Sequence, residues 1–208
     1  MTTKTFIHTI RHGHTVYNVE KRYTGTIDVS LSEKGINECR LAATKLKSFH
    51  FDIILTSKMK RTIETAQLMA NGKVSIVECD LCNERNFGIM EGHTWDEILE
   101  FDPPILLINV GNDLHTVNPQ RGEPFEDVWE RAKKFRRLIF RKYRGQSILV
   151  ISHGVFLQMF HGVLRNLNCI EALGFYPSNL ELSSFYYLGN RLIEEKKVKL
   201  SEAVAPDW

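Results

Sequence analysis

Long apolar segments are missing from this sequence of 208 residues. The best candidate, residues 105–110, is far shorter than the roughly 20 residues that cross a bilayer, and Asn112 and Asp113 soon follow it. Residues 1–4 also lack the apolar run and the cleavage site of a secretory signal. We therefore expect a soluble, cytoplasmic protein that does not bind membranes.

An excess of charge of either sign is missing too, because 27 Lys and Arg residues stand against 25 Asp and Glu residues. This near balance gives no support to nucleic-acid binding. The hydrophobic content of 43% is ordinary for a globular protein. Since there is also no internal repeat, low-complexity segment or linker, we predict a single domain over residues 1–208. Assembly into a homo-oligomer is compatible with the sequence.

Cysteine is scarce, with four residues at positions 39, 79, 82 and 169. Without secretory features, buried and reduced thiols are the default. Cys79 and Cys82 have the C-x-x-C spacing of redox and zinc motifs, but no second pair of ligands follows them. A short motif without its context is weak evidence. We therefore assign the pair to packing and expect neither a metal nor a cofactor.

Apolar periodicity predicts alternating strands and helices. Strands are expected over residues 5–10, 51–56, 74–79 and 147–151, with a hairpin over 182–188 and 191–197. Helices are expected over residues 32–46, 58–70, 95–101, 124–143 and 155–164. Ser32 and Ser57 are candidate N-caps, and Pro124 is expected at the first helical position. The alternation predicts an α/β fold with a mixed, mostly parallel sheet. Residues 86–122 are expected to form a lid-like insertion, and the tail 198–208 is ambiguous.

Polar side chains follow three of the predicted strands. Arg11 and His12 come directly after the first strand, with Gly13 beside them. Arg61 lies in the first turn of the helix after the second strand, and His153 follows the strand 147–151. In an open α/β sheet, ligands bind beyond the carboxyl ends of the strands. Each residue taken singly has an ordinary structural explanation, but together they predict one shared site.

With Glu84 from a nearby loop, these residues make a coherent phosphoryl-transfer site. Arg11, Arg61 and a protonated His153 would hold the three oxygens over which charge spreads in the transition state. A neutral His12 would attack phosphorus in line and become phosphorylated. A protonated Glu84 would give its proton to the leaving alkoxide and then activate water. Because guanidinium and imidazolium groups supply the positive charge, this chemistry needs no metal.

Six motifs occur in order along about three quarters of the chain. They are RHGxTxxN at 11–18, YTGxxDxxLSxxG at 23–35, SxxxRTxxTA at 57–66, NERNFGxxEG at 83–92, GE at 122–123 and SHG at 152–154. In this order the motifs resemble the histidine phosphatase superfamily, in its phosphoglycerate mutase-like branch. The resemblance implies a three-layer α/β/α fold, in agreement with the predicted elements.

The resemblance also implies a role for each motif residue. His12 is the phosphorylated nucleophile and Glu84 the proton donor, while Arg11, Arg61 and His153 form the phosphate clamp. The pocket for the phosphate and the substrate is implied to be lined by Asn18, Thr24, Gly25 and the backbone at Gly154.

Two positions depart from the family pattern. His14 stands where the family usually has Glu, and His cannot orient or neutralise an arginine as a carboxylate does. Pro124 stands where Ser often follows Gly-Glu, a minor change at a helix start. The remaining histidines, at positions 8, 50, 93, 115 and 161, are assigned structural roles.

The family contains phosphatases and mutases, and the catalytic core does not separate them. A phosphoglycerate mutase must hold a second anionic group with Lys and Arg from the region after the catalytic Glu. Between His93 and Gly122 this chain has one such residue, Arg121, against five acids. We therefore predict a metal-independent phosphatase for a small phosphomonoester, of the broad-specificity or α-ribazole-phosphate type. One alternative is a phosphoglycerate mutase. A second alternative, a non-catalytic phospho-ligand or protein-binding module, is less favoured because the five catalytic residues are all present.

Overall fold

A six-stranded mixed sheet forms the centre of the structure, with the order β3-β2-β6-β1-β7-β8. The structure is a computed structural model that describes residues 3–70, 72, 74–111, 113–117 and 119–200. The strands are β1 (Lys4–Arg11), β2 (Ile53–Thr56), β3 (Ile76–Glu78), β6 (Ser147–Ser152), β7 (Glu181–Leu188) and β8 (Arg191–Lys199). Strands β3, β2, β6 and β1 run parallel, whereas β7 and β8 are antiparallel to their neighbours. The predicted mixed, mostly parallel sheet is thereby confirmed.

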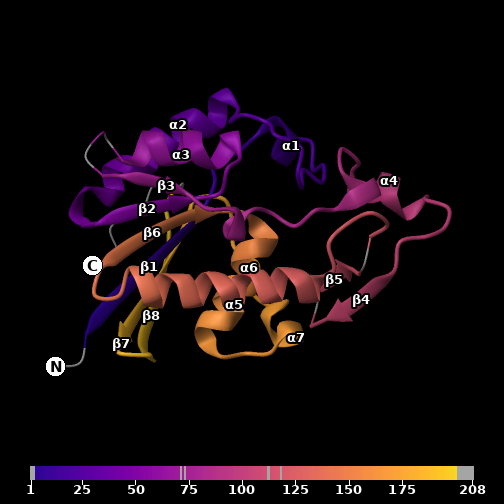
Figure 1. Ribbon diagram of the computed structural model, residues 1–208. Coiled ribbons are helices and arrows are strands. Elements are labelled where there is room, and N and C mark those ends of the chain that lie inside the picture. The colour runs from indigo at the N-terminus through magenta and orange to yellow at the C-terminus, as the bar shows by residue number, and fades with distance from the viewer. Residues whose placement is uncertain (1–2, 71, 73, 112, 118, 201–208) are drawn as a thin grey trace.

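Helices cover both faces of this sheet and give three layers. Figure 1 shows α2 and α3 on one side of the sheet and α5 and α6 on the other. The α-helices are α1 (Val16–Val19), α2 (Glu33–Lys45), α3 (Lys60–Ala70), α4 (Trp95–Leu99), α5 (Phe125–Lys142), α6 (Gly154–Arg165) and α7 (Cys169–Ala172). Short 3-10 helices are η1 (Leu46–Ser48), η2 (Asp80–Cys82) and η3 (Gly88–Met90).

The central strand β6 shows why helices must cover both faces of the sheet. All of its residues after Ser147 are buried, and successive side chains point to opposite faces of the sheet. Ile148 and Val150 belong to the apolar cluster that contains residues of α5 and α6, whereas Leu149 and Ile151 belong to the cluster on the side of α2 and α3. A continuous apolar run is therefore what a parallel strand between two helical layers requires.

The predicted elements are present, with ends shifted by a few residues. The helices α1 and α7 and the hairpin of β4 (Leu107–Val110) and β5 (Asp113–Thr116) were not predicted, since four-residue elements are too short to show a periodicity. Ser32 caps α2 as predicted, because its hydroxyl accepts a hydrogen bond from the Gly35 N–H. The prediction for Pro124 was wrong by one position: with ψ of 154° it is the N-cap of α5 rather than its first residue.

In the part of the chain that the structure describes, no helix combines the length and the apolar character of a membrane span. Residues 1–2 and 201–208 lie outside the described residues. They include the start of the N-terminal segment and most of the ambiguous tail. The described part of that tail completes β8 and ends with a buried Leu200.

Two buried histidines have the structural roles assigned to them. The Nε2 of His161 lies 2.7 Å from the hydroxyl oxygen of Thr9, and the Nδ1 of His8 lies 2.8 Å from that of Ser184. Burial lowers the pKa of His161 well below 6.5 and that of His8 to about 4. Both imidazoles are therefore neutral in the folded protein at neutral and mildly acidic pH.

We expect the free energy of unfolding to fall between pH 7.5 and pH 5.5, in part because of these two histidines. The unfolded chain takes up protons near pH 6.5 that the folded chain does not, so stability is lost as the pH falls through this value. The contribution is roughly 1 kcal/mol per histidine at pH 5.5. Urea unfolding at both pH values should show a smaller loss of unfolding free energy for His161→Gln than for the wild type. An equal loss in the two proteins would contradict the assignment.

Candidate active site

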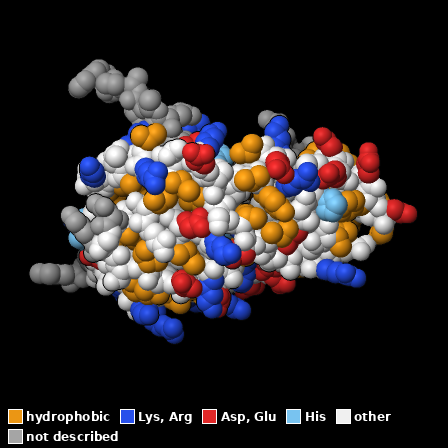
Figure 2. Space-filling view, turned by 90° about the horizontal axis from the view of Figure 1, so that it is seen from above, with side chains coloured by type: hydrophobic (Ala, Val, Ile, Leu, Met, Phe, Trp, Pro, Cys, Tyr) orange, Lys and Arg blue, Asp and Glu red, His pale blue; other side chains and the backbone are white. Residues whose placement is uncertain are grey.

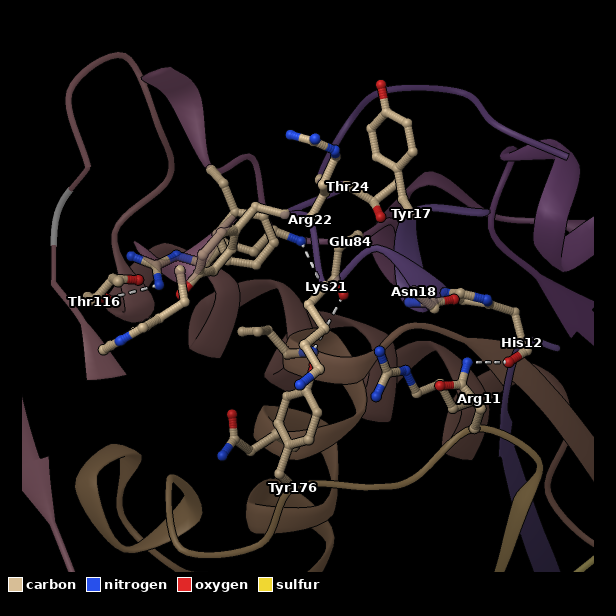
Figure 3. A pocket seen from close by; sticks show the side chains of 18 of the residues that line it. Arg11, His12, Tyr17, Asn18, Lys21, Arg22, Thr24, Glu84, Thr116 and Tyr176 are labelled. Atoms are coloured by element: carbon tan, nitrogen blue, oxygen red, sulfur yellow. Dashed lines mark hydrogen bonds between the residues drawn. The ribbon is translucent and has the colours of Figure 1, made fainter. Parts of the chain in front are cut away.

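A cavity of about 570 Å³ opens beyond the carboxyl end of β1 and beside the start of α3. Figure 3 shows its walls from close by. The residues predicted from the sequence that line it are Arg11, His12, Asn18, Thr24, Gly25, Arg61 and Glu84. His153 and Gly154, also predicted, do not line it but lie directly behind this wall. Residues from five of the six motifs are thus brought to one place.

Parallel pairing of β1 with β6 brings His12 beside His153. Arg11 and Ser152 are register partners at the strand ends, and the His12 N–H donates to the Ser152 carbonyl at 3.0 Å. The two imidazole rings that follow have centroids 5.2 Å apart. Strand β2, on the other side of β6, brings the following segment with Ser57 and Arg61 to the same edge of the sheet.

The environment of His12 defines its protonation state. Its Nδ1 lies 2.8 Å from the Gly13 carbonyl oxygen, which can only accept, so Nδ1 carries the hydrogen and Nε2 carries a lone pair. Burial and the positive charges of Arg61 and Arg11 lower the pKa of His12 well below 6.5. The Asn179 amide fixes the backbone by donating to the His12 carbonyl at 2.7 Å. His12 is thus a neutral imidazole with an unprotonated Nε2.

His153 differs from the prediction, which had it protonated. Its Nδ1 accepts a hydrogen bond from Arg61 Nε at 3.2 Å, so the hydrogen is on Nε2, which lies 2.7 Å from the Ser57 hydroxyl. Burial first, and then the charges of Arg61 and other neighbours, lower the pKa of His153 well below 6.5. The imidazole is neutral because the surrounding charge is positive.

Ser57 was expected only to cap the following helix. Its hydroxyl does accept a long hydrogen bond from the Met59 N–H, but its short contacts are to His153 and to Thr62 Oγ1, the latter at 2.7 Å. Ser57 therefore orients the ring of His153. The motif at 57–66 contained this residue, but sequence alone did not show which partner its hydroxyl meets.

Arg61 is fully buried, and each guanidinium nitrogen has a partner. Besides the bond from Nε to His153, Nη1 donates to the Ile27 carbonyl at 2.9 Å and Nη2 to the Gly25 carbonyl at 2.8 Å. Burial lowers the pKa of Arg61 to about 10, so it stays charged at neutral pH. The loop with Thr24 and Gly25 thus holds the arginine as well as lining the cavity.

Arg11 is held from the opposite side. Its Nη1 donates to the Pro177 carbonyl at 3.1 Å, and its guanidinium lies 5.0 Å from the ring centre of Tyr176. Its Nε is buried and meets no hydrogen-bond partner within the described part of the chain. Tyr176 also covers Gly154, where an added Cβ would collide with the tyrosine hydroxyl. Gly154 is therefore required for this close approach, rather than being open to the cavity as predicted.

Glu84 is 8% exposed and lies at the N-terminus of α6. Its Oε1 accepts from the N–H groups of Arg85 and Phe156 at 2.8 and 3.1 Å, and its Oε2 from that of Val155 at 3.3 Å. Figure 3 shows the carboxyl group facing the cavity from the side opposite His12. This position suits a group that exchanges a proton with a molecule in the cavity.

Asn18 occupies the predicted wall through a capping box. Its side-chain oxygen accepts from the Thr15 N–H at 3.0 Å, and the Thr15 hydroxyl accepts from the Asn18 N–H. The amide oxygen is thereby held in α1, so the NH₂ group is the part that Asn18 can offer to a ligand.

Arg85, next to Glu84, is a functional residue to which sequence reasoning assigned no role. It is fully buried, its Nε donates to the Glu123 carbonyl at 2.7 Å and its Nη1 to the Thr116 carbonyl at 2.9 Å. The guanidinium also lies 3.8 Å from the ring centre of Phe125. Arg85 therefore fixes the end of β5 and the start of α5 against the site.

The remaining wall comes largely from segments without a motif. His115, which was assigned a structural role, lines the cavity. Further lining residues are Tyr17, Lys21, Arg22, Tyr23, Phe87, Trp95, Leu114, Thr116, Phe125, Val155, Gln158, Tyr176 and Asn179. Over the described ranges, no three His, Cys, Asp or Glu side chains come together as metal ligands.

His14 lines the cavity and is paired with a carboxylate from α2. Its Nδ1 lies 2.6 Å from Oε2 of Glu38, whose other oxygen lies 3.7 Å from Lys34 Nζ. The N-terminal turn of α2 fixes this arrangement, because the Ser32 N–H and hydroxyl both donate to the His14 carbonyl. Glu38 therefore holds a carboxylate against His14, the position at which the family usually has Glu.

The structure is an α/β protein in which histidines and arginines gather at the carboxyl ends of parallel strands. The model of the histidine phosphatase superfamily (branch 1) matches residues 7–197, and the chain belongs to this family. Members of this superfamily bind small phosphorylated substrates.

Relatives within the family have two activities. Phosphoserine phosphatase 1 of Hydrogenobacter thermophilus is 29% identical over 175 residues, which cover 84% of this chain and 82% of the relative. The 2,3-bisphosphoglycerate-dependent phosphoglycerate mutase of Cytophaga hutchinsonii is 31% identical over 150 residues, or 70% of each chain. The solved structure of Bacillus stearothermophilus YhfR has a TM-score of 0.77 at 27% identity, covering 91% of this chain and 94% of that one.

We expect His14→Glu to weaken the binding of inorganic phosphate about tenfold, which corresponds to about 1.4 kcal/mol. The new carboxylate would face Glu38, and two like charges at this spacing would add negative charge beside the phosphate site. The double variant His14→Glu/Glu38→Gln should recover most of the affinity measured by titration calorimetry. Unchanged phosphate affinity in the single variant would show that the pair of His14 and Glu38 does not set the charge of the site.

Proposed function

We propose that this protein is a metal-independent phosphatase that hydrolyses a small phosphomonoester through a phosphohistidine. The observation that carries the proposal is the state of His12. An imidazole whose Nδ1 is bound to the Gly13 carbonyl has a lone pair on Nε2, and His12 lines a cavity that Arg11 and Arg61 line too. Such a group is a nucleophile already set for attack on phosphorus.

In the first step, His12 Nε2 forms a bond to phosphorus while the bond to the leaving oxygen breaks. Arg11 and Arg61 stabilise the phosphoryl oxygens, with the free Nε of Arg11 as a ready donor. Glu84 protonates the leaving alkoxide. In the second step the Glu84 carboxylate takes a proton from water, which attacks phosphorus and releases His12 and phosphate.

His153 supports this chemistry in a state that depends on the ligand. In the structure it is neutral and accepts from Arg61. A dianionic phosphoryl group would offset the positive charges that keep His153 neutral, and so favour proton uptake by its ring. The protonated His153 would then join the clamp that the sequence predicts.

Hydrolysis is favoured over transfer by the wall that residues 86–122 supply. We propose that this segment acts as a lid within a single domain. Its contribution to the cavity is Phe87, Trp95, Leu114, His115 and Thr116, without a Lys or Arg. Figure 2 shows acidic side chains gathered at the end of the molecule that carries α4. A second anionic group on the substrate therefore finds little support from this wall.

A phosphoglycerate mutase is the second candidate. Lys21 and Arg22 line the outer part of the cavity. Arg22 is bound to Glu20 and Glu97, whereas Figure 3 shows Lys21 extended across the cavity. Lys21 could meet a substrate carboxylate, and several relatives of similar identity are named as mutases. The third candidate, a binding module without activity, is disfavoured because the five catalytic residues are all in place.

We expect the wild type to release phosphate from p-nitrophenyl phosphate and from members of a panel of small phosphomonoesters, with EDTA present. His12→Ala should lower the turnover at least about a thousandfold, because it removes the group that forms the covalent intermediate. His161→Gln is the matched control, since this buried histidine lies outside the cavity, and it should retain activity.

The same panel separates the three candidates. It includes phosphoserine and 3-phosphoglycerate, assayed both for phosphate release and for conversion to 2-phosphoglycerate. Conversion without net phosphate release would assign the protein to the mutases. Silence in both assays, with inorganic phosphate still bound, would favour the binding module.

A further inference from the structure

Cys79 and Cys82 lie at the two ends of the short helix η2, and Glu84 follows two residues later. The helix is a single 3-10 turn, closed by the Cys82 N–H donating to the Cys79 carbonyl at 3.2 Å. With a rise of about 2 Å per residue, residues three apart across such a turn are about 6 Å apart. This separation is within the range that a disulfide spans.

The two thiols have different surroundings. Cys82 is fully buried, and its thiol donates to the Cys79 carbonyl at 3.1 Å, while Cys79 is half-buried. The neighbouring side chain of Cys82 lowers the pKa of Cys79 to about 6, and burial raises that of Cys82. Cys79 is thus the more reactive sulfur, and a second thiol lies beside it. The other two cysteines have raised pKa values because of burial.

The turn is bonded directly to the catalytic elements. The Ser152 hydroxyl donates to the Cys82 carbonyl at 2.6 Å, and His153 follows Ser152. Arg131 Nη1 donates to the carbonyls of Leu81 and Asn83 at 2.9 and 3.0 Å, on the two sides of Cys82. A change in the shape of η2 therefore acts on the segments that hold both Glu84 and His153.

We propose that Cys79 and Cys82 form a redox modification site that accepts a hydroperoxide and, once oxidised to a disulfide, slows the reaction at the adjacent site. The Cys79 thiolate attacks the peroxide oxygen and becomes a sulfenic acid, with release of an alcohol or water. The Cys82 thiol then displaces water from this sulfenic acid to form the disulfide. A dithiol restores both thiols by exchange. The rate effect rests on the proposed phosphatase function, whereas the disulfide itself does not.

The test treats the reduced protein with one equivalent of hydrogen peroxide. Peptide mass spectrometry should find a Cys79–Cys82 disulfide in the wild type and in Cys169→Ser, a control that removes another half-buried cysteine, but not in Cys79→Ser. Turnover of p-nitrophenyl phosphate should fall at least fivefold in the oxidised wild type, recover with dithiothreitol, and stay constant in Cys79→Ser. Inorganic phosphate affinity is measured in parallel.

The following two outcomes would overturn the proposal. Oxidation of Cys39 or Cys169 in preference to this pair would refute the site, and a disulfide without an effect on turnover would refute the control of the reaction. If reduced wild type has no turnover at all, the phosphatase proposal fails by itself. The redox proposal is then judged by the disulfide and by an at least fivefold change in phosphate affinity on oxidation.

Discussion

Positive charge held out of water at the end of the sheet is the constraint on which the rest of this structure depends. Arg61 is fully buried, and Arg11 and Arg85 contribute to the same wall. Removing such groups from water is costly unless each nitrogen finds a partner. The structure meets this cost fully for Arg61 and in part for Arg11 and Arg85, with backbone carbonyls far apart in sequence, at positions 25, 27, 116, 123 and 177. The arginines therefore stabilise the loops around the site, and the carbonyls of these loops stabilise the arginines.

The same constraint sets the chemistry of the histidines. Burial first, and then the neighbouring guanidinium charges, lower the pKa values of both imidazoles well below 6.5. For His12 this agrees with the proposed role, because a nucleophile must be neutral. For His153 the proposed clamp would gain its full charge only when an anion binds. We expect such a site to favour dianionic ligands by its resting charge.

The sequence predicted the sheet and most of the site because both have local signals. Apolar runs such as 147–151 identify buried strands, and residues directly after them must lie at one edge of the sheet. The state of His153 had no local signal, since it depends on which nitrogen meets Arg61 and which meets Ser57. Asn179 was missed for the same reason: it reaches His12 from the segment before β7, which carries no motif.

The wall opposite the nucleophile was the least predictable part, and it is the part that decides the substrate. The β4–β5 hairpin and the turn with Lys21 contribute side chains to the cavity without a motif to reveal them. Yet this wall is not independent of the catalytic core. Arg85 follows Glu84 directly and binds the carbonyls at the end of β5 and before α5. A shift of the hairpin would therefore be passed through Arg85 to the backbone that carries Glu84, the residue proposed to exchange a proton with the leaving group.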